Sequence, residues 1–327
     1  MSGTIELSGT DRVSWLAVVV LIRLIDRGEH SWLGLGLAAL TLLLWGALPL
    51  ILKLLLLSLD PFTVTWYRFL LAGALLVPVI SYRYGLASPF RLRGAALALA
   101  IACVLGLCGN YLTYLMGLQR ISPGSAQIVM QISPIFVLLG GLILFKESFG
   151  RLQWLGVGVL VVGMILFFNQ RFTELLSVID NYGQGVWLIF ASAILWGTFM
   201  LAQKALLRHL PSASIMALVY WSGVLLFLPL ASPGRAVELS TIPLLLLACS
   251  VVFTLVSYIS FAESLKRMEA SRMGALVALT PLITIGMMGL LALHDPTLVP
   301  MDPLNELASA GAILVVVGSM CCSLGRE

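Results

Sequence analysis

Two cationic side chains, Lys53 and Arg68, stand inside long apolar stretches of this 327-residue chain. A lysine or arginine within a membrane segment is costly, so its position needs a functional or structural reason. Together the two side chains would offer positive charge to the carboxylate or phosphate of a solute. The alternatives are that Lys53 extends to the outer membrane interface, and that Arg68 binds helix-terminal carbonyls or Asp60.

Uncharged groups that are able to hydrogen-bond a solute occur on other apolar segments. Trp45 and Trp196 lie well inside their segments, where a buried indole N–H needs an acceptor, although packing against adjacent glycines is the alternative. Tyr220 is expected to face lipid or a helix seam. The remaining candidates are two sets of residues whose spacing places them on a common helix face, and one Ser-Tyr pair. The alternative role of all of them is hydrogen bonding between helices. These candidates are Asn110, Tyr111, Tyr114, Gln127, Gln131, Ser257 and Tyr258.

Two prolines and one carboxylate are candidates for gating and coupling. Pro134 and Pro281 interrupt apolar segments and each removes a backbone hydrogen bond, so they would let helix halves swing or would only fix a static kink. Glu263 is the one acidic residue clearly inside a segment, followed by Lys266 and Arg267 at i+3 and i+4. It is therefore a candidate for proton or substrate coupling, with pairing to these cations as the alternative.

The chain lacks the residue patterns of a metal, cofactor or enzyme site. Its five cysteines lie in apolar segments without paired spacing or nearby histidines, and all three histidines lie in predicted loops. His-Glu-x-x-His, Asp-rich and Gly-x-Ser-x-Gly motifs do not occur in it. We therefore expect no metal, no cofactor, no nucleic-acid partner and no enzymatic activity. A membrane-embedded enzyme is the remote alternative.

Composition requires membrane helices to position these residues. Hydrophobic residues make up 60% of the chain and charged residues 10%, and the mean hydropathy is +1.04. Such a chain cannot supply a soluble surface, whereas a run of about 20 apolar residues makes a membrane span. The sequence predicts an all-α membrane protein with ten transmembrane helices, at 33–56, 61–81, 94–118, 123–145, 152–169, 184–206, 212–231, 241–265, 272–293 and 305–324.

The predicted helices divide into two units with matching residues. Trp45 and Lys53 both recur 151 residues later, as Trp196 and Lys204, and further matches continue through later helices. Each unit has five helices, an odd number, so the second unit enters the membrane from the opposite side. The sequence therefore predicts an inverted-topology 5+5 repeat. Its units are residues 32–169 and 183–324, joined by an extracytoplasmic linker at 170–182.

The distribution of lysine and arginine sets the predicted orientation. Thirteen loop cations fall on one side of the predicted helices and three on the other. Because cytoplasmic loops carry the excess, both termini are predicted to be cytoplasmic, including the tail 325–327. Residues 1–31 are predicted to be a cytoplasmic segment, whose short apolar stretch favours a helix lying in the membrane interface over disorder or a signal peptide.

The order and spacing of several motifs resemble the drug/metabolite transporter (DMT) superfamily, specifically its EamA-type branch. The resemblance covers residues 32–324. In the second unit no arginine recurs where Arg68 would, and Pro211-Ser212 replaces Asp60-Pro61. The motifs that carry the resemblance are Trp45-Gly46 with Lys53, Arg68-Phe69-Leu70, Ser133-Pro134-Ile135, Leu144-Phe145-Lys146-Glu147 and the glycines Gly156 and Gly163.

The resemblance implies two five-helix bundles around a central cavity lined by the first, third, fourth, sixth, eighth and ninth spans. It also implies a transporter that moves a small metabolite, such as an amino acid, amine or drug-like solute, by alternating access and favouring efflux. The expected partners are that substrate and the lipid bilayer of the cell inner (plasma) membrane, with the chain a monomer or homodimer. A lipid or amphiphile flippase or scramblase on the same fold is the alternative.

Overall fold

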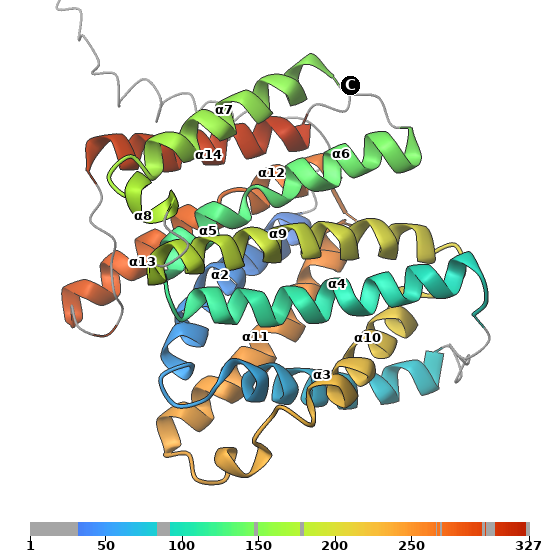
Figure 1. Cartoon of the computed structure of the whole chain (residues 1–327). Helices are drawn as coiled ribbons and strands as arrows, with labels where there is room; N and C mark the ends of the chain where they lie inside the picture. The colour runs from blue at the N-terminus through green and yellow to red at the C-terminus, as the bar shows by residue number, and fades with distance from the viewer. Residues whose placement is uncertain are drawn as a thin grey trace, which may run out of the picture.

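The computed structural model describes residues 32–83, 92–146, 150–176, 180–265, 267–268, 270–295, 298 and 305–324, and the regular elements in these ranges are all helices (Figure 1). The predicted interfacial helix within residues 1–31 and the tail 325–327 lie outside the described residues. In chain order the elements are α2 (Trp32–Leu55), α3 (Pro61–Arg83), α4 (Ala95–Leu118), α5 (Pro123–Met130), α6 (Ser133–Phe145), α7 (Arg151–Phe167), α8 (Phe172–Leu176), α9 (Asn181–Leu206), α10 (Ser212–Phe227), the 3₁₀ turn η2 (Pro233–Ala236), α11 (Thr241–Leu265), α12 (Ala270–Val277), α13 (Thr280–His294) and α14 (Glu306–Leu324).

The helices have the length and surface of membrane helices. The apolar helices α7 and α10, with 17 and 16 residues, are shorter than the seven candidate spans given below. α10 ends at Phe227 because Pro229, two residues later, has no N–H with which to continue the helix. Leu225 and Leu290 are 72% and 70% exposed, as expected of side chains that face lipid. In the described part of the chain, seven segments are long and apolar enough to cross a membrane: Trp32–Leu55, Ala95–Leu118, Pro123–Phe145, Asn181–Leu206, Thr241–Phe261, Met273–His294 and Glu306–Leu324.

Two of the predicted helices are broken rather than continuous. The segment 123–145 divides into α5 and α6 after Gln131, and the segment 272–293 divides into α12 and α13 at Ala278. Each segment is still one candidate membrane span, Pro123–Phe145 and Met273–His294, and the interruption expected at each proline is a complete break of the helix. The breaks leave backbone carbonyls without helical partners in the interior of the molecule, and polar side chains have to satisfy them.

Proline placement explains both breaks. Pro134 and Pro281 are each the second residue of the downstream helix, where the missing N–H has no helical acceptor to lose. Beyond each proline the chain tightens: Ile135 N donates to Ile132 O at 3.0 Å, and Leu282 N donates to Leu279 O at 3.0 Å. Each proline therefore starts a new helix in the middle of an apolar run.

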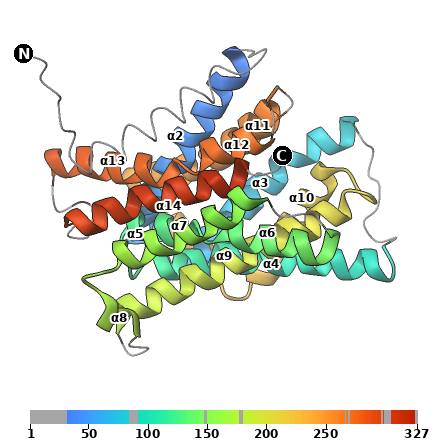
Figure 2. The same ribbon diagram turned by 90° about the horizontal axis from the view of Figure 1, so that it is seen from above.

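Helices from the two halves of the chain pack in recurring pairs. α4 lies along α9 and α2 along α11, while α6 contacts α9 and α13 contacts α2. The α7–α14 pair lies at the top of Figure 1 and the α3–α10 pair at the bottom, and Figure 2 shows the same bundle from above. Every one of these pairs joins the first half of the chain to the second, so the halves interlock.

Glycines allow the closest of these pairs to form. A Cβ atom added at Gly156 of α7 would lie 2.8 Å from the carbonyl oxygen of Gly318 in α14, and one at Gly163 would lie 2.9 Å from that of Gly311. Side-chain atoms do not approach backbone atoms so closely, whereas small residues let membrane helices meet along their backbones. The α7–α14 interface is therefore built for glycine at these four positions.

Candidate functional site

Arg68 of α3 is a cation buried in the interior of the bundle. It is 6% exposed, its Nη2 donates to Thr254 Oγ1 on α11 at 2.8 Å, and its guanidinium lies 4.6 Å from the centroid of the Tyr111 ring. The Thr254 hydroxyl donates to Ser250 O at 2.7 Å, so its oxygen is oriented to accept from the arginine. The Nε–H of Arg68 is buried and has no hydrogen-bond partner in the described residues.

Among the described residues no carboxylate pairs with Arg68. Asp60, one alternative partner considered from the sequence, caps α3 instead: its Oδ1 accepts from Thr63 N at 3.0 Å and its Oδ2 from Thr63 Oγ1 at 2.7 Å. Burying a charge without a counter-charge and with an unfilled donor is expensive. Such a group inside a membrane protein is a candidate for a functional role.

Four tyrosines surround the Arg68 charge. Tyr111 and Tyr114 come from α4, Tyr220 from α10 and Tyr258 from α11, and all four hydroxyls lie within electrostatic range of the guanidinium. Tyr111 and Tyr220 are buried, whereas Tyr114 and Tyr258 are half-buried. The surroundings of Arg68 are therefore aromatic, with hydroxyl groups as the polar component.

Trp45 and Trp196 extend this aromatic cluster across the bundle. The Trp45 ring meets Tyr258 edge to face at a centroid distance of 5.6 Å and Phe261 at 5.3 Å. The Tyr258 hydroxyl interacts with the side chains of Trp196 and Tyr111. Within the described residues neither α4 nor α9 packs along α11, so these side chains meet between helices rather than within a packed seam. We call Trp45, Arg68, Tyr111, Tyr114, Trp196, Tyr220, Thr254 and Tyr258 the Arg68 cluster.

Lys53 lies at a different place, near the end of α2. Its Nζ donates to three backbone carbonyls, those of Leu118 at 2.6 Å, Gln119 at 3.1 Å and Ile121 at 3.0 Å. These carbonyls belong to the last turn of α4 and the residues after it, where helical donors run out and positive charge is favoured. The structure thus holds Lys53 at the end of α4 and does not combine the two cations into one site.

Three predicted polar residues bind backbone or neighbouring helices. Asn110 Nδ2 donates to Ser192 Oγ at 2.7 Å and to Ser192 O at 3.0 Å, across the α4–α9 seam. Gln127 Nε2 donates to Trp45 O at 3.3 Å. Ser257 is completely buried and donates to Thr254 O at 2.9 Å. The hydrogen bonds of all three residues hold helices or a helical turn together, which is the structural alternative to solute binding.

Gln131 connects the two helix breaks. Its Nε2 donates at 3.2 Å to the carbonyl of Ala278, which follows α12, and its Oε1 accepts from Ser319 Oγ of α14 at 2.9 Å. The Ala278 carbonyl is released because Leu282 N bonds to Leu279 instead. The gating role of Pro134 and Pro281 stays a prediction, and this glutamine is the polar junction that any such movement would change.

Glu263 near the C-terminal end of α11 is held in an ion pair. Its Oε2 lies 3.0 Å from Arg267 Nη1, and the two side chains are about one-third exposed, at 34% and 32%. Partly exposed ion pairs of this kind contribute little to stability. The contact matches the structural pairing that the sequence offered as the alternative to coupling.

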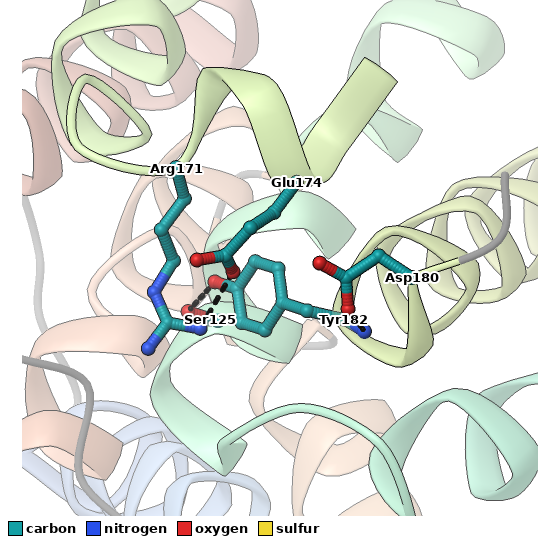
Figure 3. A network of polar contacts seen from close by, with 5 residues as sticks. All are labelled: Ser125, Arg171, Glu174, Asp180 and Tyr182. Atoms are coloured by element: carbon teal, nitrogen blue, oxygen red, sulfur yellow. Dashed lines mark hydrogen bonds and ion pairs between the residues drawn. The ribbon is translucent and has the colours of Figure 1, made fainter. Parts of the chain in front are cut away.

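A second polar cluster lies at the N-terminal ends of α5 and α9 (Figure 3). The hydroxyls of Tyr182 and Ser125 are 3.1 Å apart, and the Arg171 guanidinium lies 4.1 Å from the centroid of the Tyr182 ring. Arg171 also pairs with Glu174 of α8 at 3.3 Å, and Asp180 Oδ1 accepts from Tyr182 N at 3.1 Å. The cluster holds the connection between α7 and α9 against the N-terminal ends of α5 and α9, and we assign it a structural role.

Two members of the Arg68 cluster, Tyr220 and Thr254, are not among the site residues predicted from the sequence. Tyr220 was expected to face lipid or a seam, and it lies in the seam between α10 and α3, where it is 3% exposed and its ring is 5.4 Å from that of Phe69. This position also brings it into range of the Arg68 charge. Thr254 was not considered. It had a usable signal, since it precedes Tyr258 by four residues and therefore shares its helix face.

The fold and the Arg68 cluster define a class of protein. Apolar helices that enclose a buried cation and aromatic hydroxyls, with broken helices in the interior, are typical of multi-pass membrane transporters. A model of the EamA-like transporter family matches residues 32–169 and again residues 183–323. This chain belongs to the EamA-like transporter family, within the drug/metabolite transporter superfamily, as its motifs predicted.

Relatives of this chain are described as transporters or as an efflux pump. An uncharacterized transporter of Haemophilus influenzae is 32% identical over 299 residues, covering 91% of this chain and 97% of the relative. The uncharacterized inner membrane transporter YhbE of Escherichia coli K12 is 33% identical over 301 residues, covering 91% and 94%. A Salmonella typhimurium protein described as a probable amino-acid metabolite efflux pump is 25% identical over 297 residues, covering 86% and 92%. A crystal structure with 18% identity and a TM-score of 0.58 covers 90% of this chain and 98% of its own, and shares the fold.

Proposed function

We propose that this transporter carries a small metabolite out of the cell by alternating access, with the solute bound at the Arg68 cluster. The observation that carries the proposal is that both halves of the chain contribute to this cluster. Arg68 and Tyr111 come from the first half, and Trp196, Tyr220 and Tyr258 from the second. A site between two units changes its exposure when the units rock against each other. Efflux and a metabolite substrate also fit the Salmonella relative, which is described as a probable amino-acid metabolite efflux pump.

We propose that the units are inverted five-helix repeats, which makes ten spans in total. The helix pairs support this arrangement, because they are preserved when the two units are exchanged. The pair α4–α9 becomes α11–α2, the pair α6–α9 becomes α13–α2, and the pairs α3–α10 and α7–α14 become themselves. An axis in the membrane plane that relates the units produces this pattern. The breaks α5/α6 and α12/α13 also fall at equivalent places.

We expect substrate contact from the aromatic members of the Arg68 cluster and helix positioning from most of the other candidates. Trp45, Trp196, Tyr114 and Tyr258 are half-buried, and Tyr258 meets Trp45 and Trp196 between helices. The groups with a positioning role are those already bonded to backbone or to a second helix, namely Lys53, Asn110, Gln127, Gln131 and Ser257.

The transport proposal predicts selective release of one chemical class of solute. Purified protein in liposomes loaded with a mixed metabolite extract is expected to let that class escape while other solutes stay, as read by mass spectrometry of the external buffer. Protein-free liposomes are the control. Retention of every solute, together with accelerated exchange of labelled lipid between leaflets, would instead support the flippase or scramblase alternative and reject a metabolite carrier.

The orientation proposal is tested by labelling single cysteines. Ser58, after α2, and Arg208, after α9, are both exposed, and the proposed topology puts them on opposite sides of the inner membrane. In a variant without the five native cysteines, Ser58→Cys is expected to react with a membrane-impermeant maleimide applied from outside. Arg208→Cys is expected to react only after permeabilisation. The reverse pattern would place both termini outside the cytoplasm.

A further inference from the structure

The hydrogen-bonding of Arg68 is incomplete in a specific way. A guanidinium has five N–H donors in a planar fork, suited to the two oxygens of a carboxylate. In the described residues one donor bond is made, from Nη2 to Thr254 Oγ1, and the buried Nε–H has no acceptor. Nε and Nη2 lie along the same edge of the planar guanidinium. This edge of the guanidinium therefore still has an N–H, that of Nε, which can donate to an incoming acceptor. The acceptor would also supply the counter-charge that Arg68 lacks.

Neighbouring side chains hold this edge in place without using it. The Tyr111 ring lies under the guanidinium at 4.6 Å, and the fully buried Phe69 lies against Tyr111 at a centroid distance of 4.8 Å and against Tyr220 at 5.4 Å. A cation over an aromatic face is attracted to the ring, but the ring offers no acceptor oxygen in the guanidinium plane. Together with the Thr254 hydroxyl, these contacts orient the arginine while leaving its charge uncompensated.

The charges around the cluster discriminate between solutes. In the described helices no carboxylate faces Arg68, and Glu263 is already paired with Arg267 near the end of α11. A solute ammonium would thus meet a buried positive charge with no compensating anion. A solute carboxylate would supply the missing counter-charge and the missing acceptor together. The aromatic rings of Trp45, Trp196 and Tyr258 then remain for an apolar or aromatic solute body.

We propose that Arg68, oriented by Thr254 and Tyr111, binds the carboxylate of an organic monoanion, so that this transporter carries organic acids and does not require an amino group on them. The proposal rests on the transport function proposed above and narrows its substrate class. Thr254 is a positioning residue in this scheme, because it acts through the orientation of Arg68.

The test uses the full-length protein in liposomes loaded with a metabolite extract, and compares Arg68→Met with Thr254→Val and with Arg120→Met. Arg120 is an arginine at the end of α4 whose Nη1 donates to Met116 O, and it serves as the matched control. We expect wild-type and Arg120→Met protein to release carboxylates selectively, and Arg68→Met to release them at least about tenfold more slowly. Thr254→Val is expected to raise the half-saturating concentration with little change in the maximal rate.

Two outcomes would overturn the proposal while leaving the transporter assignment intact: preferential release of amines or neutral solutes by the wild-type protein, or undiminished carboxylate release by folded Arg68→Met. If Arg68→Met does not fold, the selectivity of the wild-type protein and the Thr254→Val kinetics decide. If the wild-type protein releases nothing, the transport function is contradicted, and the anion site is then tested by a binding measurement. In that case 3-phenylpropionate must raise the thermal unfolding temperature of detergent-solubilised protein more than 3-phenylpropionamide does, and equal shifts reject the site.

Discussion

Gly163→Leu protein is expected to unfold at a markedly lower temperature than the wild-type protein, with a loss of about 3 kcal/mol or more of folding free energy. A Cβ at this position would lie 2.6 Å from Val315 N and 2.9 Å from Gly311 O, so the obstacle is the backbone of α14 and not a flexible side chain. To accept leucine, α7 and α14 must separate along their contact. The measurement is the loss of the monodisperse size-exclusion peak of detergent-solubilised protein with temperature.

Gly158→Leu provides the control for this prediction. Gly158 lies on the same helix, five residues earlier, is exposed, and would have nothing within 4 Å of an added Cβ. Leucine is the better helix former, so at Gly158 it is expected to leave the unfolding temperature unchanged or slightly raised. Equal losses in both variants would mean that the α7–α14 contact does not depend on glycine and that the described interface is incorrect.

The positions of the helices could be predicted from the sequence because the signal is local. About 20 consecutive apolar residues are needed to cross a bilayer, and only helices satisfy the backbone there. The predicted segment 241–265 coincides with α11, and 94–118 differs from α4 by one residue. The family could be recognised for the same reason, since its motifs are short runs at fixed places along the chain.

The partners of the polar side chains could not be predicted, because they depend on which helices meet. Asn110 and Ser192 are 82 residues apart and bond only because α4 lies along α9. Tyr220 reaches the Arg68 charge only because α10 packs against α3 and α4. Periodicity could not settle these contacts, since the helices have apolar residues on most faces and therefore no strong preferred direction.

The broken helices illustrate a partial prediction. Pro134 and Pro281 marked the places where hydrogen bonds are lost. The extent of the disruption depended on which donors bond to the freed carbonyls. The Ala278 carbonyl accepts from Gln131, which lies in the other half of the chain. A donor so distant in sequence is invisible to local reasoning, so a kink and a complete break could not be distinguished.

Lys53→Met protein is expected to lose about 2–4 kcal/mol of folding free energy while binding its solute with an unchanged half-saturating concentration. The ammonium of Lys53 bonds to three carbonyls at the end of α4, at 2.6, 3.1 and 3.0 Å. Methionine keeps much of the volume of the side chain but leaves these acceptors without a donor. Thermal unfolding in detergent and concentration-dependent flux in liposomes measure the two quantities separately.

Lys204→Met is the matched control, because Lys204 matches Lys53 in the sequence at the same 151-residue spacing that relates Trp196 to Trp45. The side chain of Lys204 is exposed and its ammonium lies 4.6 Å from the centroid of the Phe145 ring. A cation–π contact at an exposed site is worth about 0.5–1 kcal/mol, and exposed ion pairs are similarly weak, so the loss of stability should be clearly smaller. A raised half-saturating concentration in Lys53→Met protein, without a change in unfolding temperature, would show that Lys53 binds the substrate and does not have the structural role. The two lysines match in the sequence but differ in their contacts, since Lys53 bonds to the end of α4 and Lys204 lies against the Phe145 ring. The comparison therefore measures the effect of these contacts.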